Sequence, residues 1–147
     1  MQAREEQLIS GKFPFDESMV LYSKIRPYLK KVSRPSFRGL CSADIYPLAP
    51  NAEILERDFL FHLLLTADFT DYAIKGSARA GMPKVNRPHL FAYSFNLPPL
   101  PTQQAIVEKL DALSEETKAL EAIYERKQSA LAELKQSLLQ KAFAGEL

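Results

Sequence analysis

The carboxy-terminal part of the chain contains one uninterrupted stretch, from Thr102 to Ala144, with no glycine and no proline. Thr102 is a favourable helix N-cap residue, and Gly145, directly after the stretch, is a common helix stop signal. The stretch therefore predicts a single helix of about 63 Å, at a rise of about 1.5 Å per residue. A helix this long cannot be the core of a small domain, so it limits the possible folds more than any other feature.

Apolar side chains recur along this predicted helix with the spacing of a coiled-coil seam, interrupted by Thr117, Lys127 and Lys141. A long amphipathic helix is held mainly by packing along its apolar stripe. Because the sequence supplies only one such helix, we expect its partner to come from another chain. The predicted seam residues are Ile106, Leu110, Leu113, Leu120, Tyr124, Leu131, Leu134 and Leu138.

A cluster of prolines, Pro98, Pro99 and Pro101, lies directly before this helix. Proline lacks an amide donor and has a restricted φ angle, so the cluster excludes a helix interior or a central strand. We therefore expect two parts, a domain over residues 1–101 and the long helix over residues 102–147.

The residues before the prolines contain three regions with the character of strands. β-Forming side chains from Met19 to Val32 predict a strand pair or one bent strand, broken at Pro27. Alternation from Leu40 to Leu48 predicts a second strand, and alternation from Leu90 to Leu97 predicts a final one.

Between these strands, apolar residues from Ile54 to Ile74 recur at helical spacing, with an interruption near Thr66–Asp68. This pattern predicts two short helices packed on a sheet. A loop without periodicity follows, from Gly76 to Pro83. The predicted fold class is α+β, with a mixed α/β domain followed by a long helix of the coiled-coil type.

The formal net charge is only +1, but the charge is unevenly distributed. Two stretches, Lys24–Arg38 and Lys75–Arg87, contain basic residues and no acidic ones. Such cations can hold DNA phosphates, and arginine can also read guanine through two hydrogen bonds. The alternatives are a solvated strand edge, where lysines deter aggregation, and a plain connector after a helix that ends at Gly76. The candidate DNA-binding residues are Lys24, Arg26, Lys30, Lys31, Arg79, Lys84 and Arg87.

No residue pattern indicates catalysis or a bound metal. With only His62 and His89 beside it, the single Cys41 belongs to no spaced set of zinc ligands. We expect Cys41 to be buried and His62 to pack in the core. The run Asn96–Leu100 differs from the Asn-Pro-Pro-aromatic motif of amino-methyltransferases, and a proline stop explains it better. We therefore expect no enzyme activity, catalytic residue, cofactor or metal.

No run approaches the roughly 18 apolar residues needed to cross a bilayer. The first ten residues carry charges where a signal peptide needs an apolar core. We therefore expect a cytoplasmic protein without a membrane partner.

Three segments together resemble the specificity subunits of type I restriction-modification systems: Leu21–Val32, Gly76–Arg87 and Asn96–Val107. They occur in the order of that family and are followed by the long heptad helix, which ends in Lys141–Gly145. The resemblance implies a DNA-binding subunit with two target recognition domains, separated by two spacer helices that pack antiparallel and set the distance between two half-sites. It also implies methyltransferase subunits that use S-adenosylmethionine, and a separate restriction subunit that cuts DNA.

This chain has one spacer helix, and residues 1–101 are shorter than a full recognition domain of the family. Our leading hypothesis is a non-catalytic specificity subunit, or a fragment of one, that directs methylation and restriction by its partners. The expected partners are double-stranded DNA, the methyltransferase and restriction subunits, and a second spacer helix from a homodimer or from a split partner chain. The alternative is a truncated interaction module that engages the methyltransferase subunit through its helix and does not bind DNA.

Overall fold

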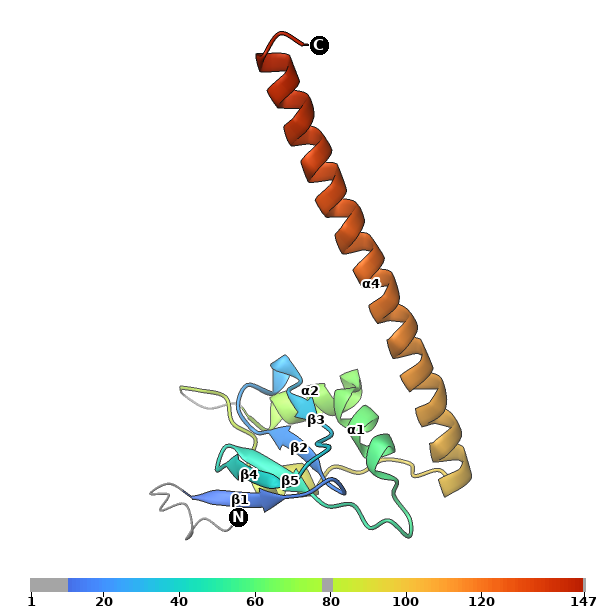
Figure 1. Ribbon diagram of the computed structural model, residues 1–147. Helices are drawn as coiled ribbons and strands as arrows, with labels where there is room; N and C mark the ends of the chain where they lie inside the picture. Colours follow the sequence, from blue (N-terminus) through green and yellow to red (C-terminus); the bar gives the residue numbers. More distant parts are fainter. Residues whose placement is uncertain (1–10, 78–80, 147) are drawn as a thin grey trace. The chain divides into compact units, whose positions relative to one another are not determined.

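The computed structural model describes residues 11–77 and 81–146, and the chain divides into two compact units, Met1–Val107 and Glu108–Leu147. The first unit contains all of the strands and short helices of the described residues, and the second consists mainly of one helix (Figure 1). The α+β fold class predicted from the sequence is confirmed.

The strands of the first unit form two small antiparallel sheets. In the smaller sheet, β1 (Lys12–Phe15) pairs with β4 (Gly39–Ser42). In the larger sheet, β2 (Val20–Ser23) lies between β3 (Val32–Ser33) and β5 (Ile45–Leu48). Of the two alternatives predicted for Met19–Val32, a strand pair or one bent strand, the strand pair is confirmed, because β2 and β3 are antiparallel neighbours.

The prediction of a single strand from Leu40 to Leu48 is wrong. The segment instead forms β4 and β5, separated by a turn at Ala43 and Asp44, and the two strands pair with different neighbours. Ser42, Ala43 and Asp44 are three consecutive exposed residues, so the alternation expected of one strand stops at the turn.

Two short helices follow the strands, as predicted. Helix α1 (Arg57–Leu65) is capped by the Glu56 carboxylate, which accepts a hydrogen bond from the Phe59 amide at 2.8 Å. Helix α2 (Ala67–Lys75) is capped by the Thr66 hydroxyl, which accepts from the Phe69 amide at 3.3 Å. An N-cap residue has a non-helical backbone, so Thr66 ends one helix and starts the next.

The prediction of a final strand from Leu90 to Leu97 is also wrong. Helix α3 (Arg87–Phe91) occupies the start of this segment, and residues 93–99 have no regular structure. The Asn86 side chain accepts a hydrogen bond from the His89 amide at 2.8 Å, and Pro88 occupies the first turn. These are strong helix-start features, and here they override the alternation of aromatic residues.

The core of the first unit lies between the larger sheet and the short helices. The Tyr22 ring meets the Phe69 ring edge-on, with centroids 5.5 Å apart, and Phe69 meets Tyr93 at 5.1 Å. Cys41 is buried and free, as expected. The buried core residues are Val20, Tyr22, Leu64, Phe69, Ala73, Val85 and Leu90.

Helix α4 (Leu100–Phe143) has 44 residues and confirms the long helix expected from the sequence. It begins two residues before Thr102, which is therefore not the N-cap: its amide donates to the Pro99 carbonyl at 2.9 Å. Proline lacks an amide donor, so Pro101 is tolerated in the first turn of the helix, where amides have no helical partner. The first turns of α4, up to Val107, belong to the first unit, and a domain boundary between residues 101 and 102 stays a prediction.

Candidate DNA-binding surface and helix seam

The fold brings the two basic stretches of the sequence together. The Arg26 amide donates to the Pro83 carbonyl at 3.0 Å, and the Val85 amide donates to the Lys24 carbonyl at 2.9 Å. Ile25 and Lys84 form the antiparallel bridge between these bonds. We call the paired segments Lys24–Arg26 and Pro83–Val85 the basic bridge. The sequence predicted both basic stretches but not that they are neighbours.

Two of the candidate lysines converge on one acidic residue, Asp44. The Lys84 ammonium lies 3.3 Å from the Asp44 carboxylate, and the Lys24 ammonium lies 3.8 Å from it. Lys24 also donates to the Ala43 carbonyl and lies 5.2 Å from the centre of the Tyr46 ring. Its side chain is only 13% exposed, whereas that of Lys84 is 39% exposed. Lys84 is therefore the more accessible cation of this pair.

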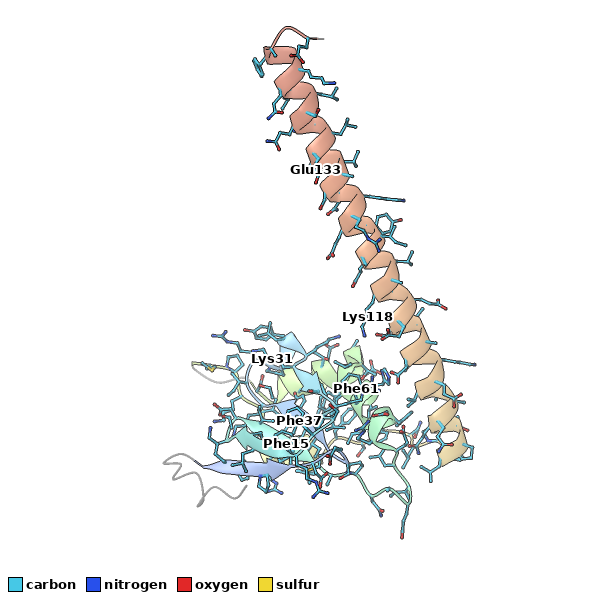
Figure 2. The ribbon with its side chains drawn as sticks, in the orientation of Figure 1. Phe15, Lys31, Phe37, Phe61, Lys118 and Glu133 are labelled. Carbon is cyan, nitrogen blue, oxygen red and sulfur yellow. The ribbon has the colours of Figure 1, made fainter. Side chains whose placement is uncertain are left out.

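Three further candidates lie around the 3-10 helix η1 (Pro27–Leu29), and all three are exposed. Arg26 and Lys30, at its two ends, have left-handed φ angles of 53° and 47°. Non-glycine residues rarely adopt this conformation, and such strain is often found at functional sites. The Lys30 ammonium donates to the Leu65 carbonyl at 3.2 Å. Lys31 follows directly and is labelled in Figure 2.

The remaining two candidates lie apart from this group or outside the description. Arg87 is exposed at the start of α3, with its guanidinium 5.5 Å from the centre of the Phe91 ring. It lines an apolar groove of about 490 Å³ together with Phe91 and Phe95. Arg79 lies outside the described residues.

Gln103 is a buried polar residue that the sequence analysis did not single out. It is fully buried, and its side-chain amide group donates to the carbonyls of Ile54 and Pro98, both at 2.8 Å. Its side-chain oxygen accepts from the Glu56 amide at 2.9 Å. The neighbouring Gln104 is exposed. Nothing in the sequence distinguishes the two glutamines, because they are adjacent residues shortly after the prolines.

Every side chain of the predicted seam is exposed, from 36% at Ile106 to 66% at Leu131. Ile123 and Leu139, which flank the seam, are exposed as well. An apolar stripe of this length on a single helix is a surface that another chain can cover. The other seam residues, with exposures between these two values, are Leu110, Leu113, Leu120, Tyr124, Leu134 and Leu138.

Within residues 11–77 and 81–146, no group of three or more His, Cys, Asp or Glu side chains is arranged to hold a metal ion. None of the described helices combines the length and the apolar character of a membrane span.

The chain belongs to the family of the type I restriction modification DNA specificity domain, which matches residues 3–129. This match includes most of the first unit and much of α4. The resemblance inferred from three segments of the sequence is therefore confirmed.

Among curated proteins, the specificity subunit of the type I restriction enzyme EcoDI from Escherichia coli is 40% identical over 143 residues. The match covers 97% of this chain and 32% of that subunit. The chain therefore spans about a third of the length of this relative.

Two solved structures are similar. The crystal structure of the HsdS subunit from Thermoanaerobacter tengcongensis matches with a TM-score of 0.64 and 29% identity, over 71% of this chain and 28% of that one. A chain from a study of complex assembly and conformational transition of the type I R-M system matches with a TM-score of 0.74 over 91% of this chain and 32% of that one. Its identity is 24%, so this second likeness concerns the fold alone.

Proposed function

We propose that this chain is a DNA-binding part of a type I specificity subunit, which directs methylation and restriction carried out by other subunits. The observation that carries the proposal is the basic bridge, because it gathers cations from two separate stretches of the sequence at one place. The chain itself would perform no catalytic step and hold no cofactor. It would act in the cytoplasm, with double-stranded DNA, the methyltransferase subunit and the restriction subunit as partners.

Within this proposal, the exposed cations of the basic bridge and of η1 hold DNA phosphates. Arg26 and Lys31 are exposed, and among residues 11–77 and 81–146 neither side chain forms an ion pair or a hydrogen bond. Lys84 adds a third cation, which also forms an ion pair with Asp44. Phosphate contacts of this kind position a protein on DNA, whereas contacts to base edges select the sequence. We expect Lys30 and Arg87 to contribute more weakly, because Lys30 donates to the Leu65 carbonyl and Arg87 lies over the Phe91 ring. Arg79, outside the described residues, stays a candidate.

The long helix is proposed to bind a second spacer helix in antiparallel orientation. Residues 108–125 contain six acidic and two basic residues, a net charge of −4, whereas residues 126–141 contain four basic and one acidic, a net charge of +3. Antiparallel pairing of two copies places the acidic part of each helix opposite the basic part of the other. Parallel pairing would place like charges opposite each other, which is unfavourable. The second helix would come from a second copy or from the other half of a split subunit.

Salt-dependent DNA binding tests the proposal. For a mixed-sequence duplex, each phosphate that a cation neutralises adds about 0.9 to the slope of log K against log salt. We expect Arg26→Gln combined with Lys31→Ala to lower this slope by about 1.8, measured by fluorescence anisotropy. The matched control is Lys118→Ala, which removes a cation on the exposed face of α4 beside Glu115 (Figure 2). An unchanged slope in the double variant would refute the proposed contacts.

The second candidate function is an interaction module without DNA binding. The exposed seam supports this second function, because the helix could bind another subunit even if the first unit does not bind DNA. No binding of the wild-type chain to DNA at low salt, either alone or with the methyltransferase subunit, would favour this alternative.

A further inference from the structure

The first turn of α4 is attached to the rest of the first unit by a single buried side chain, Gln103. Its backbone amide bonds to the Pro99 carbonyl at 3.0 Å, as part of the start of the helix. Its side chain crosses to two other segments and reaches the backbone of Ile54, Glu56 and Pro98. Gln103 therefore links the turn before α1, the proline segment and the start of α4.

The Gln103 side chain uses both kinds of polar atom that a primary amide offers. Two N–H bonds go to carbonyl oxygens, and the side-chain oxygen accepts from an amide. A buried amide must be hydrogen-bonded in this way, because a buried polar group without a partner destabilises the fold. Only glutamine combines this length with two donors and an acceptor, so no other side chain can replace all three bonds.

The composition of the linker makes this connection important. Pro98, Pro99 and Pro101 have no amide hydrogen, so the backbone there offers few donors to the domain. Val107, one turn beyond Gln103, is the next buried residue of the helix. Beyond it, the described residues of α4 are exposed, apart from the partly buried Asp111.

We propose that Gln103 is a positioning residue, which locks the first turn of the spacer helix onto the recognition domain. The significance of this role rests on the proposed function. A spacer can set the distance between two DNA half-sites only if the start of the helix is fixed to the recognition domain that precedes it. Without the Gln103 hydrogen bonds, the first turn of the helix would follow the proline segment with much weaker attachment to the domain.

The test measures distances in the full chain by double electron–electron resonance. Spin labels are placed on Asp71→Cys in α2 and Ala105→Cys in the first turns of α4, both exposed positions within the first unit. Cys41, which is buried, is replaced by alanine so that only the two introduced cysteines react. An excess of unlabelled chain suppresses distances between copies.

The decisive variant is Gln103→Met, which preserves the length of the side chain but cannot make the three hydrogen bonds. We expect a narrow, single-peaked distance distribution for the wild type and one at least twice as wide for Gln103→Met. The matched control is Gln104→Met at the exposed neighbouring position, which should leave the distribution unchanged. A narrow distribution in Gln103→Met, or a broad one in the wild type, would overturn the proposal.

Circular dichroism establishes whether the first unit still folds in each variant. If Gln103→Met is unfolded, Gln103→Asn takes its place, because it keeps a neutral amide but is too short to reach all three partners. A broadened distribution in the folded Asn variant supports the positioning role, and an unchanged one refutes it. The measurement needs no DNA, so a wild-type chain that fails to bind DNA would refute the proposed function without affecting this result.

Discussion

Replacing two seam leucines by aspartate, Leu113→Asp together with Leu120→Asp, should abolish pairing of the long helix with a second helix. Leu113 is 58% exposed and Leu120 is 55% exposed in the chain by itself, so rather more than half of each side chain remains to be covered. Full burial of a leucine side chain contributes about 1.5–3 kcal/mol. Covering the remaining half therefore contributes about 1–1.5 kcal/mol for each leucine.

In a symmetric pair, two leucines from each of two helices are covered, so the apolar loss in the double variant is about 4–6 kcal/mol. This corresponds to a dissociation constant that is weaker by about three to four orders of magnitude. The introduced carboxylates add to the loss, because charges without a partner are costly at a packed interface.

Sedimentation equilibrium over a range of concentrations measures this association directly. The matched control is Ala122→Asp with Ser129→Asp, which adds the same two charges at exposed positions on the side of α4 away from the seam. It should pair about as well as the wild type, although the two added carboxylates slightly change the long-range electrostatic attraction between the helices. A seam variant that associates as strongly as this control would refute the assignment of the seam.

Two further outcomes follow from individual side chains. Asp44→Asn should strengthen binding to a mixed-sequence DNA duplex and steepen its salt dependence, because it releases the two lysines that converge on this carboxylate. An anisotropy titration measures the affinity. Weaker binding would instead show that Asp44 orients the two lysines for DNA. Burial raises the pKa of Tyr22 to about 12, and its hydroxyl has no hydrogen-bond partner among the described residues. In the unfolded state, the Tyr22 hydroxyl therefore loses its proton at a lower pH than in the folded state. Its contribution to the free energy of unfolding is complete below about pH 10 and declines as pH rises toward 12. Tyr22→Phe should remove this decline and raise the free energy of unfolding by up to about 1 kcal/mol, measured by urea titration at pH 8 and pH 11; an equal decline in both proteins would contradict the assignment.

Structural elements that depend only on residues close together in the sequence were predicted well. The long helix follows from the lack of glycine and proline between Thr102 and Ala144, and the break at Thr66 follows from the interrupted spacing of apolar residues. The alternation from Leu90 to Leu97 was misleading, because the cap at Asn86 started a helix instead. Local periodicity therefore predicted an element best where no capping signal competed with it.

The amino-acid sequence by itself determined the rod-like helix, its apolar stripe, the supply of cations and the family. These properties depend on residues within a few turns of one another or on their chemical type. Tertiary structure alone decided that Lys24 and Lys84 share Asp44, and that Gln103, rather than Gln104, is enclosed. Both outcomes depend on contacts between segments far apart in the chain, such as Lys84 with Asp44 and Gln103 with Glu56, and no pattern in a short stretch specifies which distant segments will meet.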